Sequence, residues 1–289
     1  MRGFANAGKW KCPISAGERK RGLSGFRRIA ALIGSVALLL SSACSVGETE
    51  GRASSGEVRL YVLAAASLTD AVREIQARYE ADHPGVRLVP TFASSGRLKQ
   101  QIERGAPADL FLSAGTGEME ELLGKGLIDP RFHAELLENE LVLIAPEGAS
   151  LKGLADLASN RVKRIAVGHP ETVPAGMYAR EALVHFGLWE KLQRKLVFAG
   201  DVRQVLAYVK TGNADAGIVY RTDIRHGGVS VIAEMPPESH RRILYPLGLV
   251  KGTKHPSEAQ ALYRWLQEKE ARSIFEKYGF KGVAAEPAK

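Results

Sequence analysis

The chain has 289 residues, of which 25% are charged, and a formal net charge of +8 at pH 7. This length suffices for one large domain or for two lobes with sizeable cores. The positive charge is unevenly placed, because eight lysines and arginines against one acidic residue lie within residues 1–43. The remaining chain carries about +1, so the high net charge gives no support to a nucleic-acid-binding surface.

The first 43 residues have the composition of a bacterial secretion signal. Basic residues, among them Arg27 and Arg28, precede the apolar run Ile29–Leu40. This run is too short to span a bilayer comfortably, and small residues follow it. We therefore expect a signal peptide over residues 1–43.

The segment that ends at Cys44 resembles a lipobox, in which the cysteine receives a lipid anchor. A lipobox usually has leucine three residues before the cysteine, whereas here Ser41 holds that position and Leu40 lies one residue further back. Plain cleavage near Ala43 is the alternative. We expect lipidation at Cys44, a flexible Gly/Ser-rich tether over residues 44–56 and an exported protein that is membrane-anchored, or periplasmic without the lipid.

From Glu57 onward, strand-like and helix-like stretches alternate, which predicts βα units and mostly parallel sheets. The expected strands are Arg59–Leu63, Val86–Phe92, Ala106–Ser113, Glu140–Ala145, Arg164–Gly168, Ala214–Tyr220 and Arg241–Val250. The expected helices are Leu68–Tyr79, Leu98–Gly105, Glu118–Leu127, Pro174–Gly187, Val202–Gly212 and a closing helix over Ala259–Tyr278.

Two serines stand where an expected strand gives way to a helix. Ser67 can cap its helix through the hydroxyl, with Asp70 completing a variant of the capping box, and Ser95 occupies the same kind of junction. The functional alternative is an anion site, because free backbone N–H groups and a hydroxyl at a helix start attract negative charge.

Three further donors lie at later junctions. Pro174 is placed for the first helical position, which leaves the N–H of Ala175 free. Asp201 can cap a helix that begins at Val202, and Tyr220 closes a strand with a hydroxyl. Each of these residues could have a purely structural role.

The sequence lacks the usual catalytic signatures, and its seven histidines do not have metal-ligand spacing. We therefore predict no enzyme activity, no cofactor and no bare metal ion. Neutral donors without acceptors suit an anion that carries no proton. Arg97 and Arg203 are expected to face outward or to contribute only long-range attraction.

Six short motifs together resemble the periplasmic molybdate-binding proteins of ABC importers, over nearly all of Val58–Phe280. The motifs are Ala64–Thr69, Phe92–Ser95, Gly105–Phe111, Val173–Gly176, Asp201–Arg203 and Gly217–Tyr220. In that family, serine hydroxyls, backbone N–H groups and a tyrosine hydroxyl hold the oxyanion. The resemblance places these roles on Ser67, Ser95, Ala175, Val202 and Tyr220.

The same resemblance implies a two-lobed type II periplasmic-binding-protein fold of α/β class, with the ligand in the cleft. Lobe I is expected at 57–138 plus 242–286, and lobe II at 139–241. The implied protein is a monomeric substrate-binding lipoprotein that captures molybdate and tungstate. It is expected to deliver them to a membrane permease and its ATPase subunit.

Two other classes stay open. A binder of another tetrahedral oxyanion, with sulfate the nearest rival, shares the fold easily. A hydrolase would need a base beside Ser67 or Ser95, and no histidine falls in either motif. Iron would call for clusters of tyrosine, histidine or carboxylate that the junctions do not offer.

Overall fold

The computed structural model describes residues 57–283. The predicted signal peptide, the proposed lipid site Cys44, the tether 44–56 and residues 284–286 of the predicted lobe I lie outside the described residues. Within the described part, no helix is long and apolar enough to cross a membrane.

Eleven strands and eight α-helices follow one another along the described chain. The strands are β1 Val58–Ala65, β2 Val86–Ala93, β3 Leu110–Leu112, β4 Ile128–Glu138, β5 Leu141–Pro146, β6 Ile165–Gly168, β7 Leu196–Ala199, β8 Ala216–Tyr220, β9 Val229–Glu234, β10 Leu244–Val250 and β11 Lys281–Gly282. The α-helices are α1 Thr69–Asp82, α2 Ser95–Glu103, α3 Thr116–Gly124, α4 Pro174–His185, α5 Trp189–Leu192, α6 Val202–Lys210, α7 Pro256–Trp265 and α8 Lys269–Lys277. Short 3-10 helices are Ala66–Leu68, Leu154–Ala158, Gln193–Lys195, Arg221–His226 and Pro237–Ser239.

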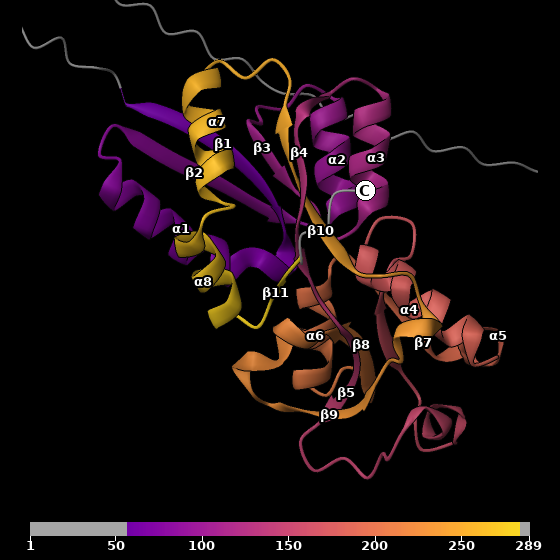
Figure 1. Cartoon of the computed structure of the whole chain (residues 1–289). Helices are drawn as coiled ribbons and strands as arrows, with labels where there is room; N and C mark the ends of the chain where they lie inside the picture. The colour runs from indigo at the N-terminus through magenta and orange to yellow at the C-terminus, as the bar shows by residue number, and fades with distance from the viewer. Residues whose placement is uncertain (1–56, 284–289) are drawn as a thin grey trace, which may run out of the picture. The chain divides into compact units, whose positions relative to one another are not determined.

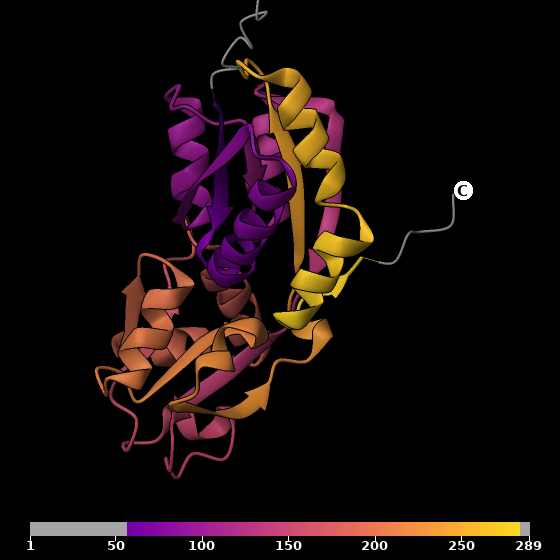
Figure 2. The ribbon, with the colours of Figure 1, turned by 90° about the vertical axis from the view of Figure 1, so that its left-hand side faces the viewer.

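The strands form two separate sheets, and Figures 1 and 2 show helices around each of them. One sheet has six strands in the order β11-β4-β10-β3-β1-β2, and the other has five in the order β7-β6-β8-β5-β9. We call the first sheet with α1, α2, α3, α7 and α8 lobe I, and the second with α4, α5 and α6 lobe II. The predicted two-lobed α/β fold is confirmed.

The sheets are mixed rather than mostly parallel. Strand β1 runs parallel to β2 and β3, and β6 runs parallel to β7 and β8. Strands β4, β5, β9, β10 and β11 pair antiparallel with their neighbours. The antiparallel pairs include the strands that enter or leave a lobe, so the chain does not follow a simple βα repeat there.

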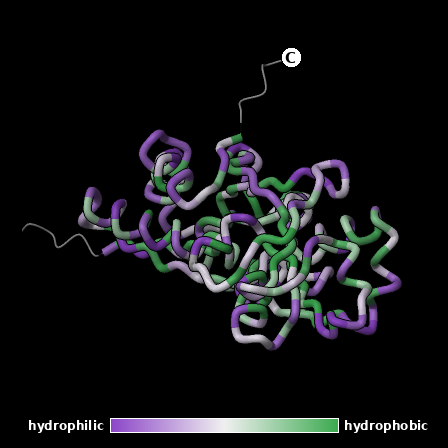
Figure 3. Tube along the Cα trace, turned by 90° about the horizontal axis from the view of Figure 1, so that it is seen from below, coloured by the Kyte–Doolittle hydropathy of each residue, from purple (hydrophilic) through white to green (hydrophobic). Residues whose placement is uncertain are grey.

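Apolar residues on both faces of the lobe I sheet explain its two helical layers. Helices α2 and α3 pack on one face over Leu63 and Phe111, through Leu98 and Met119. Helices α1, α7 and α8 pack on the other face, in a core that continues into lobe II. In Figure 3 hydrophobic stretches of the trace gather in the interior, and many hydrophilic residues lie toward the periphery.

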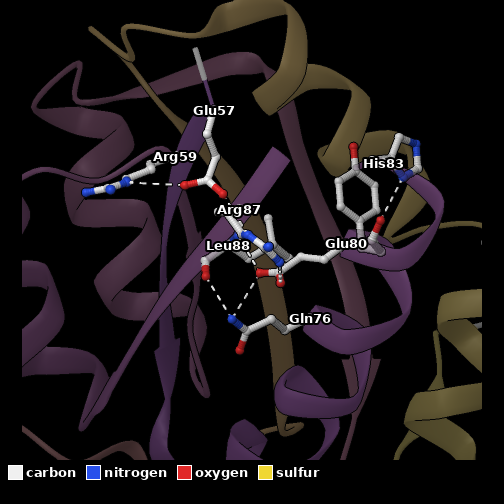
Figure 4. A network of polar contacts seen from close by, with 8 residues as sticks. Glu57, Arg59, Gln76, Glu80, His83, Arg87 and Leu88 are labelled. Atoms are coloured by element: carbon white, nitrogen blue, oxygen red, sulfur yellow. Dashed lines mark hydrogen bonds and ion pairs between the residues drawn. The ribbon is translucent and has the colours of Figure 1, made fainter. Parts of the chain in front are cut away.

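A polar network outside the core anchors helix α1 to the edge strand β2 (Figure 4). The carboxylate of Glu80 accepts hydrogen bonds from the backbone N–H of Leu88 at 2.9 Å and from the Arg87 guanidinium at 2.8 Å. The Gln76 amide donates to the Leu88 carbonyl at 2.9 Å, and Arg87 also reaches Glu57 at 2.8 Å. These contacts fix helix α1, which begins directly after the 3-10 turn that holds Ser67.

Several predicted elements also differ from the structure. The closing helix over Ala259–Tyr278 is in fact two helices, α7 and α8, separated at Leu266–Glu268. Strands β4, β7, β9 and β11 and the short helix α5 were not predicted. In β4, exposed and half-buried residues interrupt the apolar run. Helix α1 begins at Thr69, since a 3-10 turn precedes it.

Two crossovers join the lobes. Strand β4 of lobe I leads directly to β5 of lobe II through Asn139 and Glu140, and the chain returns between β9 and β10. The residue boundaries predicted for the lobes stay a prediction.

Candidate functional site

All five residues predicted for the site line one small cavity, of about 10 Å³, between the lobes. Lobe I contributes the turn after β1, the start of α2 and the segment after β3, whereas lobe II contributes the starts of α4 and α6 and the end of β8. The complete lining is Ala65, Ala66, Ser67, Ser94, Ser95, Ala114, Val173, Pro174, Ala175, Asp201, Val202 and Tyr220.

Ser67 lies inside the 3-10 turn Ala66–Leu68 and is buried. The predicted capping box with Asp70 is wrong, because neither this turn nor α1 has a side-chain cap. The extra turn moves the start of α1 beyond Ser67, so its hydroxyl is free to bond elsewhere. Ser67 Oγ lies 3.0 Å from the hydroxyl of Tyr245, a residue of β10 that the sequence did not single out.

Ser95 is the first residue of α2 and is fully buried. Its hydroxyl does not cap the helix but accepts a hydrogen bond from the backbone N–H of Ala114 at 2.9 Å. The neighbouring Ser94 holds the N-cap position and makes no cap bond. Its buried hydroxyl also lines the cavity and has no hydrogen-bond partner among the described residues. The sequence analysis did not assign Ser94 to the site, and the only signal for it is its position directly before Ser95.

Ala175 and Val202 bring helix N-termini to the cavity. Pro174 is the first residue of α4, as predicted, so Ala175 supplies the first N–H of that helix. Asp201 caps α6 by accepting a hydrogen bond from the Gln204 N–H at 2.9 Å, which confirms its predicted role. The first N–H groups of a helix have no acceptor within it and carry its positive partial charge.

Tyr220 ends β8 and is buried between the lobes. Its hydroxyl donates to the carbonyl of Ala114 in lobe I at 3.1 Å. Burial raises the pKa of Tyr220 well above its ordinary value, so the hydroxyl keeps its proton. The Ala114 peptide therefore contacts two site residues, Ser95 through its N–H and Tyr220 through its carbonyl.

The described lining of the cavity includes no lysine or arginine. Arg203 does not face outward, because its side chain is mostly buried and bonds to Asp70 of lobe I. Its Nε also lies 3.1 Å from the buried carboxylate of Asp223, without the alignment of a hydrogen bond. Lobe II thus places a cation between two carboxylates beside the cavity. Arg97 is exposed, as expected, and its guanidinium passes close to Gly200 of lobe II.

A backbone contact joins the two lobes beside the site. The N–H of Gly96 in α2 donates to the carbonyl of Thr172 in lobe II at 3.1 Å. A Cβ atom on Gly96 would lie 2.7 Å from that carbonyl oxygen, so only glycine permits this approach. Two α/β lobes that close over a shared polar cavity have the architecture of proteins that bind a small solute between them.

The comparison with known proteins agrees with this architecture. The profile described as bacterial extracellular solute-binding protein matches residues 60–281, so the chain belongs to that family. This confirms the family resemblance drawn from the motifs.

Two curated relatives are similar over most of their length. The chain is 44% identical to the putative ABC transporter substrate-binding lipoprotein YvgL of Bacillus subtilis, over 87% of this chain and 96% of the relative. It is 42% identical to the molybdate-binding protein ModA of Escherichia coli, over 80% of this chain and 91% of the relative.

Solved structures share the fold. The substrate-binding domain of a putative molybdenum ABC transporter from Clostridium difficile is 41% identical, with a TM-score of 0.62, and covers 78% of this chain and 100% of its own. The periplasmic molybdate-binding protein of Azotobacter vinelandii is 26% identical, with a TM-score of 0.70 and the same coverage. The sulfate-binding protein SubI of Mycobacterium tuberculosis covers 79% of this chain and 88% of its own, and at 15% identity its TM-score of 0.67 shows the fold alone.

Proposed function

We propose that this protein is the substrate-binding component of an ABC importer, and that it captures molybdate and, nearly equivalently, tungstate. The observation that carries the proposal is the set of neutral donors that lines one cavity between the lobes: Ser67, Ser95, Ala175, Val202 and Tyr220. The names of the curated and solved relatives support molybdate as the ligand.

Each donor has a physical reason to bind an anion. The helix N-termini at Ala175 and Val202 offer N–H groups at the positive ends of α4 and α6. Ser95 Oγ already accepts a bond from Ala114 N–H, so its own proton remains to be donated. Tyr220 would have to rotate its proton from the Ala114 carbonyl toward the ligand.

Such a site discriminates by size and by protonation. In a cage built for molybdate, the smaller sulfate ion would leave buried donors unpaired, at about 1–3 kcal/mol each. Near neutral pH, phosphate carries a proton that needs an acceptor. We therefore expect both ions to bind much more weakly than molybdate.

In this proposal the protein works as a monomer with no cofactor and no enzymatic activity. Lobe I comprises residues 57–138 and 242–286, and lobe II comprises residues 139–241. Cys44 carries a lipid that holds the exported protein at the membrane beside its permease and ATPase, in line with the lipoprotein name of YvgL. Membrane fractionation of the expressed protein tests the anchor.

Thermal unfolding in the presence of different anions tests the ligand. A ligand that binds only the folded protein adds about 2.7 kcal/mol at a hundredfold excess over its dissociation constant. We expect molybdate and tungstate to raise the Tm by similar amounts, and sulfate and phosphate at equal concentration and ionic strength to leave it unchanged. Calorimetric titration then gives the dissociation constants.

Sulfate is the second candidate, because it is also a tetrahedral dianion without a proton and the same neutral donors of the lining would suit it. A shift of the Tm with sulfate as large as that with molybdate would assign the protein to sulfate. No shift with any oxyanion would contradict the proposed function as a whole.

A further inference from the structure

A chain of hydrogen bonds runs from the proposed site to the first crossover between the lobes. Ser67 Oγ lies 3.0 Å from the hydroxyl of Tyr245, and the Asn139 amide nitrogen lies 3.1 Å from the same hydroxyl. Tyr245 is buried at the start of β10, and Asn139 follows β4 in the first crossover. Tyr245 and Asn139, which are far apart in the sequence, thus lie in contact next to Ser67.

The partners of Asn139 fix the direction of this chain. Its side-chain oxygen accepts a hydrogen bond from the N–H of Glu140 at 2.9 Å, which determines the orientation of the amide. Its nitrogen then donates one proton to Thr222 Oγ1 at 2.9 Å and the other to the hydroxyl of Tyr245. An amide nitrogen cannot accept, so the Tyr245 oxygen is the acceptor in this pair.

The proton of Tyr245 therefore has Ser67 Oγ as its acceptor. The opposite arrangement, in which Ser67 donates to Tyr245, would leave the tyrosine proton buried without a partner, which costs about 1–3 kcal/mol. With the Ser67 oxygen accepting, the serine proton is free to point into the cavity. Ser95 is held in the same way, since the N–H of Ala114 can only donate.

We propose that Tyr245 is a positioning residue that turns Ser67 into an obligatory donor, so that the site selects fully deprotonated oxyanions. This inference rests on the proposed function. Successive hydrogen bonds in one direction polarise each other, which strengthens the last donor of the chain. The oxygens of Ser67 and Ser95 each already accept one hydrogen bond, so the proton of a ligand such as hydrogen phosphate meets no ready acceptor at these two residues.

Replacement of Tyr245 by phenylalanine removes the hydroxyl and retains the ring. The ring packs edge-on against Tyr220, with centroids 5.7 Å apart, and against Phe280 at 5.3 Å. Burial raises the pKa of Tyr245 well above its ordinary value, so the wild-type hydroxyl is protonated at every pH of interest.

The experiment is calorimetric titration of Tyr245→Phe with molybdate and with phosphate. We expect molybdate affinity to fall about three- to tenfold, and the preference for molybdate over phosphate to shrink. A merely structural role would not change this preference. Tyr79→Phe is the matched control, because Tyr79 is equally buried but packs against Trp265, away from the cavity.

A double-mutant cycle tests whether Tyr245 acts through Ser67. In a Ser67→Ala background, Tyr245→Phe should have no further effect on molybdate affinity, whereas two independent contributions would add. Asn139→Asp is a second test that keeps the side-chain shape. It replaces the amide donor with an acceptor, so Tyr245 should turn its proton away from Ser67, with the same loss of affinity.

Two results would overturn the inference: wild-type affinity in both Tyr245→Phe and Asn139→Asp, or additive effects in the cycle. Both require that the wild-type protein binds molybdate. Absence of binding by the wild type would instead contradict the proposed function, so the two failures are distinguishable.

Discussion

The proton of a serine hydroxyl can take several directions, and at this site the bonds to each oxygen limit the choice. Ser67 and Ser95 are both buried, and each has a hydrogen-bond partner behind its oxygen, in Tyr245 and Ala114 respectively. Neither hydroxyl oxygen accepts a capping hydrogen bond from a helix N–H. At the residue scale, the hydroxyl protons of Ser67 and Ser95 are therefore available to be donated to a ligand oxygen.

Ser67→Ala and Ser95→Ala should each weaken molybdate binding by about 1.5–3 kcal/mol, or roughly 10- to 150-fold. Each variant loses a hydrogen bond to the charged ligand. Neither variant loses a helix-capping bond, so the loss of affinity is the main expected effect. Calorimetric titration measures the change. Ser273→Ala is the control, because Ser273 is exposed on α8 and bonds only to the Glu270 carbonyl. Unchanged affinity in both site variants would remove these serines from the ligand set.

At the element scale, the sequence predicts the helix starts that carry strong local signals. Pro174 and Asp201 mark the beginnings of α4 and α6, and both hold the expected positions. The break between α7 and α8 contains neither glycine nor proline, so the sequence predicts one continuous helix there. Capping residues and proline therefore predict where a helix begins, whereas a break such as that between α7 and α8 depends on tertiary packing.

The sequence likewise predicts those parts of the site that are contiguous in the chain, and misses contacts between distant residues. The motifs around Ser67 and Tyr220 identify lining residues because each motif is contiguous in the sequence. The partner of Ser67 is 178 residues away in β10, and the contact depends on how two crossovers return the chain to lobe I. Nothing in the sequence around Tyr245 distinguishes it from an ordinary core tyrosine.

The buried carboxyl group of Asp223, in the 3-10 helix that follows β8, predicts a pH dependence of stability. It is fully buried at the start of the 3-10 helix Arg221–His226, and burial raises its pKa from 3.8 to about 7, despite the opposing effect of Arg203. The carboxylates of Asp201 and Asp70 face the same region and add to the rise. The folded protein therefore binds more protons than the unfolded chain between about pH 4 and pH 7.

Through this group, stability should fall as the pH rises across that window. Asp223→Asn keeps an acceptor for the N–H of Tyr220, which Asp223 Oδ2 accepts at 3.2 Å, and cannot ionise. We expect the Tm of the variant, relative to that of the wild type, to increase steadily from pH 4 to pH 7. Thermal unfolding followed by circular dichroism measures the difference. A constant difference across this range would contradict the raised pKa.

At the scale of the whole molecule, the two lobes meet through a few close contacts around the cavity. Gly96 bonds to Thr172, Tyr220 bonds to Ala114, and Arg203 pairs with Asp70. These contacts can form only when the lobes are closed, and they surround the residues proposed to bind the ligand. Closure and binding should therefore be coupled.

Gly96→Ala tests this coupling. The added methyl group would lie 2.7 Å from the Thr172 carbonyl oxygen and 2.8 Å from its Cα atom, and backbone atoms cannot easily move aside. We expect molybdate affinity to fall about tenfold or more, with little change in the Tm measured without anion, because the open form has no clash. Calorimetry and thermal unfolding measure the two quantities.

Gly117→Ala in α3 is the matched control, since a Cβ atom there meets nothing within 4 Å. Equal affinities of the Gly96 and Gly117 variants would show that the backbone contact between the lobes does not support binding.

The hydrogen bond between Gly96 and Thr172 also bears on how long a captured ion stays bound. An ion enclosed by both lobes leaves only after they separate, so the dissociation rate is limited by the breaking of contacts that the ion itself does not make. These contacts are the same whichever ion lies inside. Molybdate and tungstate should therefore depart at nearly the same rate, and Gly96→Ala should shorten the residence times of both by the same factor.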